Sequence, residues 1–320
     1  RRGRPAVSAH LHGRIFAAFA AAWVVPSMVG PFLAGAVAEY LDWRWAFLGV
    51  AVLTAAAFLM IAVRLRGVDL GRGTPQDRKT LIVRLVLAVV VAVLSVVVGF
   101  SADLQPSMRW PVALGAVLAI GFAVMPLLPR RTLHAGAGLP SVVLMRGIVA
   151  GAFFAAEAYI PYLLMKKFDF TATWAGIALM LAALAWAGAS ALQGRFGERL
   201  GNHRITTISL SSLLIAMLCV LTAAVFDVSA AVVVVAWAFA GGGMGLLYPR
   251  LTVLTLAYSD DTVLGFISSA LSISDASGSA VAIALAGLGV ATLGGGAGAF
   301  SAVFAFCIVL VVLALVPGLR

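Results

Sequence analysis

The stretch "AAWVVPSMVGPFLAGAVAEYLDWRWAF", residues 21–47, decides the class of fold. Its apolar part is long enough to cross a bilayer, since a spanning helix needs about 20 mostly apolar residues. Pro26 and Pro31 lie inside this run, and proline kinks a helix because it lacks a backbone N–H. A membrane bundle tolerates the kink because neighbouring groups satisfy the freed carbonyl. The stretch therefore predicts a bent membrane helix that ends at a polar turn around Asp42 and Arg44.

The whole chain has the composition of an integral membrane protein. Of its 320 residues, 63% are hydrophobic and 11% are charged, whereas a soluble domain is about half apolar and a quarter charged. Because an open sheet cannot satisfy its backbone in lipid, we expect an all-α integral membrane protein. The sequence has about 10 candidate transmembrane helices: 15–38, 45–64, 82–102, 110–128, 142–165, 171–193, 205–226, 229–250, 262–290 and 298–318.

The positive charges support this helix count and predict the orientation. If the N-terminal end is cytoplasmic, the only Lys and Arg residues outside are Arg44, Arg109, Lys166 and Lys167, and the rest of the 22, Arg146 among them, are cytoplasmic. This separation follows the positive-inside rule, so we expect a multi-pass plasma-membrane protein with both chain ends in the cytoplasm. The net charge of +10 is divided among short clusters, which argues against a nucleic-acid partner.

No metal, cofactor or enzyme chemistry is expected. The two cysteines, Cys219 and Cys307, each lie in an apolar run, where cysteine behaves as a small apolar residue. The four histidines lie in or beside polar loops and do not cluster at the spacing of metal ligands.

Two polar stretches divide the chain. "RLRGVDLGRGTPQDRKT", 64–80, has the glycine, proline and mixed charge of a flexible linker, and "LLPRRTLHAGAGLP", 127–140, is a second one. We expect four parts: two helices that end an N-terminal half (1–66), a cytoplasmic linker (67–80), an extra central hairpin (81–128) and a six-helix C-terminal half (129–320).

Several motifs resemble those of the major facilitator superfamily. "GPFLAG", residues 30–35, is similar to the antiporter motif in the fifth helix of its exporters, and "DWRWAF", 42–47, to the start of the sixth helix in the drug/proton antiporter branch. "GRFGERLGNHR", 194–204, resembles a degenerate copy of the family's loop motif, with Glu198 in place of Asp. The central hairpin is similar to that of the 14-helix branch.

This resemblance covers essentially the whole chain and implies a major facilitator-type helical bundle. The ten segments match helices 5 to 14, so the resemblance implies that the first four helices precede Arg1. Gly30 and Ala34 form a small-residue pair that lets another helix approach closely, by analogy the segment 171–193. Either this is a seam that opens and closes, or it is ordinary close packing. The conformational motif would comprise Pro26, Gly30, Pro31 and Gly35.

The loop motif is a candidate cytoplasmic latch. A charge pair there could hold one conformation and break in the other, although a plain solvated loop is an equal alternative. The latch residues would be Gly194, Glu198, Arg199, Gly201 and Arg204.

Glu157 lies far from either end of an apolar segment. A charge at mid-membrane costs at least about 2.5 kcal/mol and marks function by default. Burial favours the neutral form of a carboxyl group, so Glu157 is a candidate for proton exchange, with Tyr159 as a polar neighbour. The alternative is a structural acid that is hydrogen-bonded between helices.

Asp275 is the second acid within an apolar segment. With Ser268, Ser272 and Ser279 it occupies one helix face. Such a stripe should face the bundle interior or a water-filled cavity, where it would bind substrate or a proton. The alternative is serine-mediated helix packing.

We therefore expect a secondary active transporter that exports drug-like or lipophilic small molecules in exchange for protons, by alternating access. Its partners would be the lipid bilayer, a small-molecule substrate and protons. A major facilitator transporter of a metabolite is the first alternative. A membrane sensor or a polytopic enzyme is disfavoured, because the chain shows neither a soluble domain nor a catalytic constellation.

Overall fold

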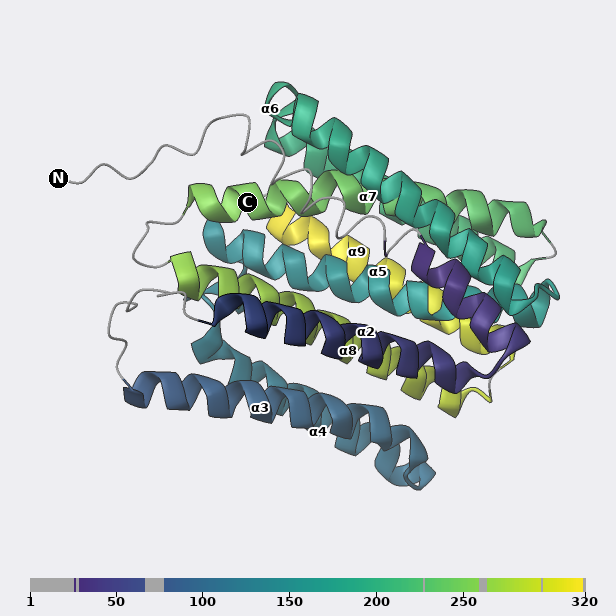
Figure 1. The fold of residues 1–320 in the computed structure, drawn as a ribbon, viewed down its shortest axis with the longest axis horizontal. Helices are drawn as coiled ribbons and strands as arrows, with labels where there is room; N and C mark the ends of the chain where they lie inside the picture. Colours follow the sequence, from purple (N-terminus) through teal and green to yellow (C-terminus); the bar gives the residue numbers. More distant parts are fainter. Residues whose placement is uncertain are drawn as a thin grey trace.

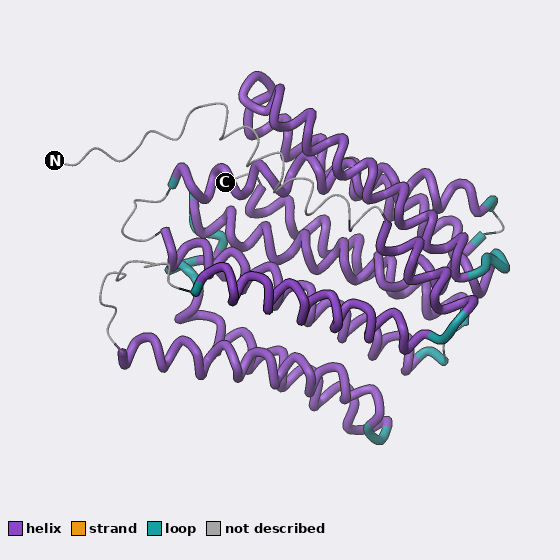
Figure 2. The backbone as a smooth tube through the Cα atoms, in the orientation of Figure 1, coloured by secondary structure: helices purple, strands orange, loops and turns teal. Residues whose placement is uncertain are grey.

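The computed structural model describes residues 26, 29–66, 78–226, 228–258, 264–294 and 296–318. Within these ranges all regular structure is helical, as expected (Figure 2). A first helix covers residues 29–40, and the start of the expected span 15–38 lies outside the described residues. The other long helices are α2 (Trp43–Leu65), α3 (Arg78–Phe100), α4 (Pro106–Val124), α5 (Leu139–Lys167), α6 (Ala172–Val225), α7 (Ala230–Ala257), α8 (Leu264–Thr292) and α9 (Ala297–Gly318).

Eight helices of the described part are long and apolar enough to cross a membrane. One of them, α6, consists of two helices that meet at Gly201, where the backbone has φ 74° and ψ 163°. That positive φ suits glycine, which has no Cβ to clash. With α6 divided and the first helix included, the structure agrees with the prediction of about 10 spans. The expected loop over 194–204 is wrong, because helix continues on both sides of Gly201.

The helix ends have local causes. Asp42 caps α2, since its carboxylate accepts the N–H of Arg44 at 2.8 Å. The Arg44 guanidinium lies 4.8 Å from the ring centre of Trp43, so the charged turn expected after the first helix also contains a cation–π contact. Thr171 caps α6 in the same way, accepting the N–H of Trp174 at 3.4 Å.

The helices run roughly along one axis, and their connections gather at two ends (Figure 1). α3 and α4 pack against each other, and α3 also packs against α8. α5 lies between α8 and α9, while α7 packs along both parts of α6. The larger core lies on α5 to α9, while α4 buries one face in a second core beside α8, and α3 buries only Val91 and Val98.

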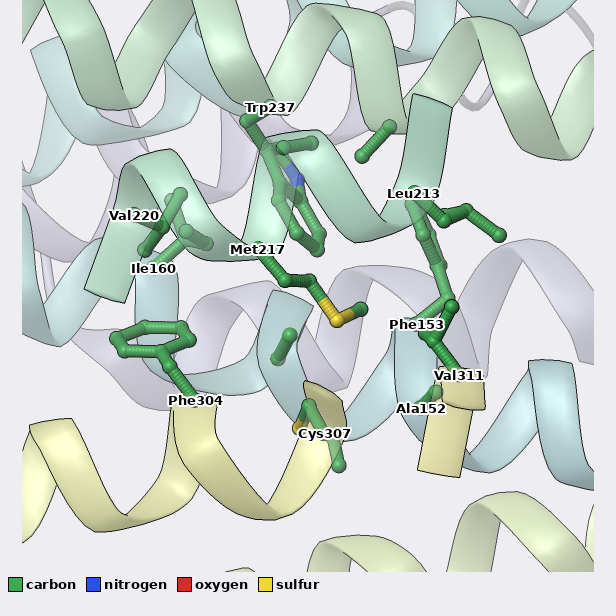
Figure 3. Packing of buried hydrophobic residues seen from close by; sticks show 14 of the residues in the cluster. Ala152, Phe153, Ile160, Leu213, Met217, Val220, Trp237, Phe304, Cys307 and Val311 are labelled. Atoms are coloured by element: carbon green, nitrogen blue, oxygen red, sulfur yellow. The ribbon is translucent and has the colours of Figure 1, made fainter. Parts of the chain in front are cut away.

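The main core joins α5, α6, α7 and α9. Figure 3 shows Trp237, Met217, Phe153 and Phe304 among its side chains. The rings of Phe153 and Trp237 stack with their centres 4.9 Å apart. Lipid tails are as apolar as these side chains, so burying the side chains between helices does not gain the free energy of removing them from water. Van der Waals packing holds such helices together instead.

Candidate functional site

The position of the site follows from the crossing of α5 and α8. A Cβ on Gly278 would overlap the backbone of Gly147, so the two helices touch backbone to backbone. Ser274, one turn before Gly278, donates its hydroxyl to the carbonyl oxygen of Val143 at 2.7 Å, away from solvent. These contacts determine which residues face each other next to the crossing: Arg146 on α5 and Asp275 on α8.

A second close crossing places α7 against the first part of α6. A Cβ on Gly245 would overlap the carbonyl oxygen of Trp186, and Ser190 donates to the carbonyl oxygen of Gly245 at 3.0 Å. The glycine-rich run of α7 is therefore a packing surface. It brings Tyr248 against Trp186, edge to face, with ring centres 5.0 Å apart.

Arg146, Asp275 and Tyr248 form one polar cluster between α5, α8 and α7. The Asp275 carboxylate lies 3.3 Å from Nε of Arg146 and 3.4 Å from its NH2 nitrogen. The Tyr248 hydroxyl donates to the same carboxylate at 2.7 Å. The guanidinium carbon lies 3.5 Å from the centre of the Tyr248 ring, and Nη1 of Arg146 donates to the Tyr248 carbonyl oxygen at 3.3 Å. Four contacts therefore hold the arginine in one orientation.

This cluster lines a cavity of about 690 Å³, a volume that accommodates a drug-sized molecule. The wall is mostly apolar and aromatic, and Pro31 of the first helix contributes to it. Among the residues that the structure describes, three ionisable side chains line it: Arg146, Asp275 and Glu157. The other lining residues are Phe153, Phe154, Leu179, Ala182, Ala183, Trp186, Ala187, Ser190, Tyr248, Pro249 and Thr252. Across the described ranges, no group of three or more His, Cys, Asp or Glu side chains could hold a metal ion.

Only some of the expected site residues meet at this cavity. Asp275 and Glu157 line it together. Tyr159 lies to one side, with its ring centre 6.0 Å from that of Tyr162. Ser268 and Ser272 are exposed, and the Ser272 hydroxyl donates to the carbonyl oxygen of Ser268 at 3.2 Å within their own helix. The polar stripe of α8 therefore reaches the cavity at Asp275.

The conformational motif lies against α6. A Cβ on Gly35 would lie 2.5 Å from the Ala172 carbonyl oxygen, and one on Gly176 would overlap the Pro31 carbonyl oxygen. This contact, which we call the seam, comprises Pro31 and Gly35 with Ala172 and Gly176. The expected Gly30 and Ala34 pair does not make it.

Beside the seam, Ala34 is exposed, Pro26 is exposed, and a Cβ on Gly30 would meet nothing within 4 Å. The close-packed face therefore contains Pro31 and Gly35 and not Gly30 and Ala34. Both pairs are four residues apart, so the spacing in the sequence could not distinguish them.

The candidate latch residues surround the turn of α6. Gly194, Glu198, Arg199 and Arg204 are exposed. Close to them, Nε of Arg250 on α7 donates to Oδ1 of Asn202 at 2.5 Å. This bond ties the end of α7 to the turn at Gly201.

Sequence reasoning counted Arg146 among the cytoplasmic charges and did not recognise it as part of a site. Its side chain is only 14% exposed and pairs with Asp275 inside the bundle. The available signal was its position in the apolar run "SVVLMRGIVAGAFF", 141–154. Tyr248 and Trp186 were also missed, since an aromatic residue in an apolar helix gives no sign of which neighbour it meets.

The comparisons with known proteins agree with this architecture. The sequence profile of the Major Facilitator Superfamily matches residues 6–283. Multidrug export protein EmrB from Escherichia coli (strain K12) is 26% identical over 208 residues, which is 58% of this chain and 38% of that protein. EmrB from Escherichia coli O157:H7 matches equally, so the match spans less than half the length of these relatives. Since the superfamily profile covers most of the sequence, the chain belongs to the Major Facilitator Superfamily.

Proposed function

We propose that the protein is a proton-coupled exporter of drug-like or lipophilic small molecules that works by alternating access in the plasma membrane, with both ends of the chain in the cytoplasm. The observation that carries this proposal is the cavity of about 690 Å³, with its aromatic wall and two acids. An apolar wall with few fixed polar groups suits a lipophilic substrate. The similarity to a protein named as a multidrug exporter supports the same substrate class.

Proton coupling requires a group that gains and loses a proton at the substrate site. Acids inside membrane segments are the groups that serve as proton relays in pumps and transporters. Of the described residues, Glu157 and Asp275 are those that bring a carboxyl group to the cavity wall. One or both of them exchange the coupling proton in this proposal.

Alternating access requires an element that closes one end of the pathway and then releases it. The seam supplies such an element, because its two helices touch through backbone atoms with no side chain between them. Pro31 belongs both to the seam and to the cavity wall. A change in substrate or proton occupancy can therefore act on the seam directly. Rocking of one bundle against another is the usual form of alternating access.

The test uses the full-length protein in proteoliposomes with an imposed pH gradient and ethidium, a lipophilic aromatic dye, as substrate. We expect dye efflux that depends on the pH gradient. At least one of the two variants, Glu157→Gln and Asp275→Asn, should lose this dependence. If coupling were unchanged in both variants, the assignment of the site would be wrong. If the gradient drove a small polar metabolite and not the dye, the substrate class would be wrong.

A further inference from the structure

The two acids of the cavity have different surroundings. The Asp275 carboxylate has Arg146 at 3.3 and 3.4 Å and accepts the Tyr248 hydroxyl at 2.7 Å. In the part of the chain that the structure describes, no hydrogen bond or ion pair reaches the Glu157 carboxyl group. The cavity therefore contains one acid with two polar partners and one with none.

The pairing of Arg146 with Asp275 is built into the backbone. Both residues flank the α5–α8 crossing, where Gly147 and Gly278 touch. The guanidinium is held from its other side by the ring and the carbonyl oxygen of Tyr248. Moving the arginine away from the carboxylate requires breaking contacts with two helices.

The charged and titratable groups around the two acids are few. Arg146 and Glu157 come from α5, Tyr248 from α7 and Asp275 from α8, and the lining residues of α6 contribute none. Arg84 of α3 also contacts α8, but through the Phe266 ring, 4.4 Å from its centre. Asp275 thus faces one positive charge and one hydroxyl donor, whereas Glu157 lines the same cavity and interacts with Tyr248 through electrostatics alone.

These surroundings favour opposite protonation states. An adjacent positive charge and hydrogen bonds to a carboxylate both favour its ionised form. Desolvation without a partner favours the neutral form. Removing one member of a buried ion pair leaves an uncompensated charge, which the remaining acid can relieve by taking up a proton.

We propose that Arg146 is a positioning residue that keeps Asp275 ionised, and that Glu157 alone carries the coupling proton; this rests on the proposed proton-coupled transport. Asp275 and Arg146 then remain a neutral pair throughout the cycle. Glu157 takes up a proton on one side of the membrane and releases it on the other. The substrate and that proton compete for the unpaired carboxylate.

The experiment is labelling of the full-length protein in membranes with N,N′-dicyclohexylcarbodiimide, followed by peptide mass spectrometry. This apolar reagent takes the proton of a neutral carboxyl group, and the carboxylate oxygen then adds to the carbodiimide carbon. We expect the label on Glu157 and none on Asp275. In Arg146→Gln, Asp275 should also become labelled. The matched control is Arg84→Gln, which removes an arginine that contacts α8 elsewhere and should leave Asp275 unlabelled.

Label on Asp275 in the unaltered protein, or its absence in Arg146→Gln, would overturn the proposal. If Arg146→Gln does not fold, the double variant Arg146→Gln, Asp275→Asn has no unpaired charge at the cluster and serves instead. The label on Glu157 in this double variant should keep the pH dependence that it has in the unaltered protein, whereas loss of that label would show that Glu157 does not carry the proton independently of the pair. Labelling does not depend on transport, so a labelled Glu157 in a protein without proton-driven efflux would refute the proposed function alone.

Discussion

The crossing of α5 with α8 and the seam between the first helix and α6 both bring helix backbones together at glycine, but their surroundings differ. At the α5–α8 crossing, Gly147 and Gly278 touch inside a bundle in which a large share of α5 is buried. Ser274 adds a buried hydrogen bond to Val143. This crossing is part of the scaffold, because separating it would open a packed core.

The seam has the same backbone contact without that support. Among residues 29–40 none is buried. The hydrogen bond beside the seam runs from the N–H of Thr173 to the exposed Glu39 carboxylate, at 3.0 Å. Because separating the seam would not open a core, we propose that the seam is the crossing that moves. In this proposal the same backbone contact serves as a fixed joint at one crossing and as a separable one at the other, and the burial around it makes the difference.

The largest effect on stability is expected for Gly278→Ala. Its methyl group would overlap the backbone of Gly147, and backbone cannot yield as a flexible side chain can. Overpacking of this kind costs about 1–3 kcal/mol. The midpoint of thermal unfolding in detergent should fall clearly below that of the unaltered protein.

The control for this prediction is Gly289→Ala on the same helix, where a Cβ would meet nothing within 4 Å. Alanine favours helix over glycine, so this variant should be as stable as the parent or more so. Equal unfolding midpoints for the two variants would show that the α5–α8 crossing is not a fixed joint.

For the seam, Gly35→Ala should impair transport with little change in stability. The added methyl group would lie 2.5 Å from the Ala172 carbonyl oxygen, so the closed seam is disfavoured. A bias of about 1–3 kcal/mol shifts the balance between two conformations by about 5–150-fold. Efflux rate and thermal unfolding should be measured on the same preparation.

Gly30→Ala is the matched variant, because a Cβ at Gly30 has open space around it. It should transport normally. If Gly30→Ala lost as much transport as Gly35→Ala, the moving contact would lie on the helix face of Gly30 and Ala34, as the sequence suggested.

Ser274→Ala tests the polar support of the fixed crossing. The change removes a buried hydrogen bond to the Val143 carbonyl oxygen and should cost about 0.5–1.5 kcal/mol of stability. Ser272→Ala removes a bond within one helix and should have a smaller effect on the unfolding midpoint. The reverse order would mean that Ser274 does not support the crossing.

The smallest effect is expected for the pH dependence of the contact beside the seam. The nearby hydroxyl of Thr173, together with the N–H that Thr173 donates, lowers the pKa of Glu39 from its ordinary value of 4.5. The bond is therefore fully present above pH 4.5 and is lost as the pH falls through the lowered pKa.

Hydrogen exchange of the Thr173 amide, compared with Glu39→Ala at each pH, measures this bond. The ratio of the two exchange rates should stay constant from neutral pH down to about 4.5 and approach one below it. Asp103→Asn, an exposed acid in the α3–α4 connection, should leave the ratio unchanged. A ratio that changes near neutral pH would show that a different group titrates at this contact.

How far sequence reasoning reached differs between the fold and the site. The membrane helices, their approximate number and the separate hairpin could be predicted, because each depends only on runs of apolar residues and on breaks between them. Glu157 and Asp275 were recognisable for a similar reason, since a charge in an apolar run is conspicuous wherever the run packs. Arg146 was not recognised as a site residue, because a cation seven residues from the start of its helix can also lie at the membrane surface.

The sequence by itself determined that this chain is a bundle of membrane helices, two of which carry an acid within the apolar run, because transfer from water to lipid depends on the composition of each segment alone. The tertiary structure alone decided that Arg146, Asp275 and Tyr248 meet, and that Gly35, not Gly30, makes the seam. Helices that are apolar on every side carry little information about which face meets which neighbour. That choice depends on the close fit of small residues and backbone at each crossing, which exists only when both helices are present.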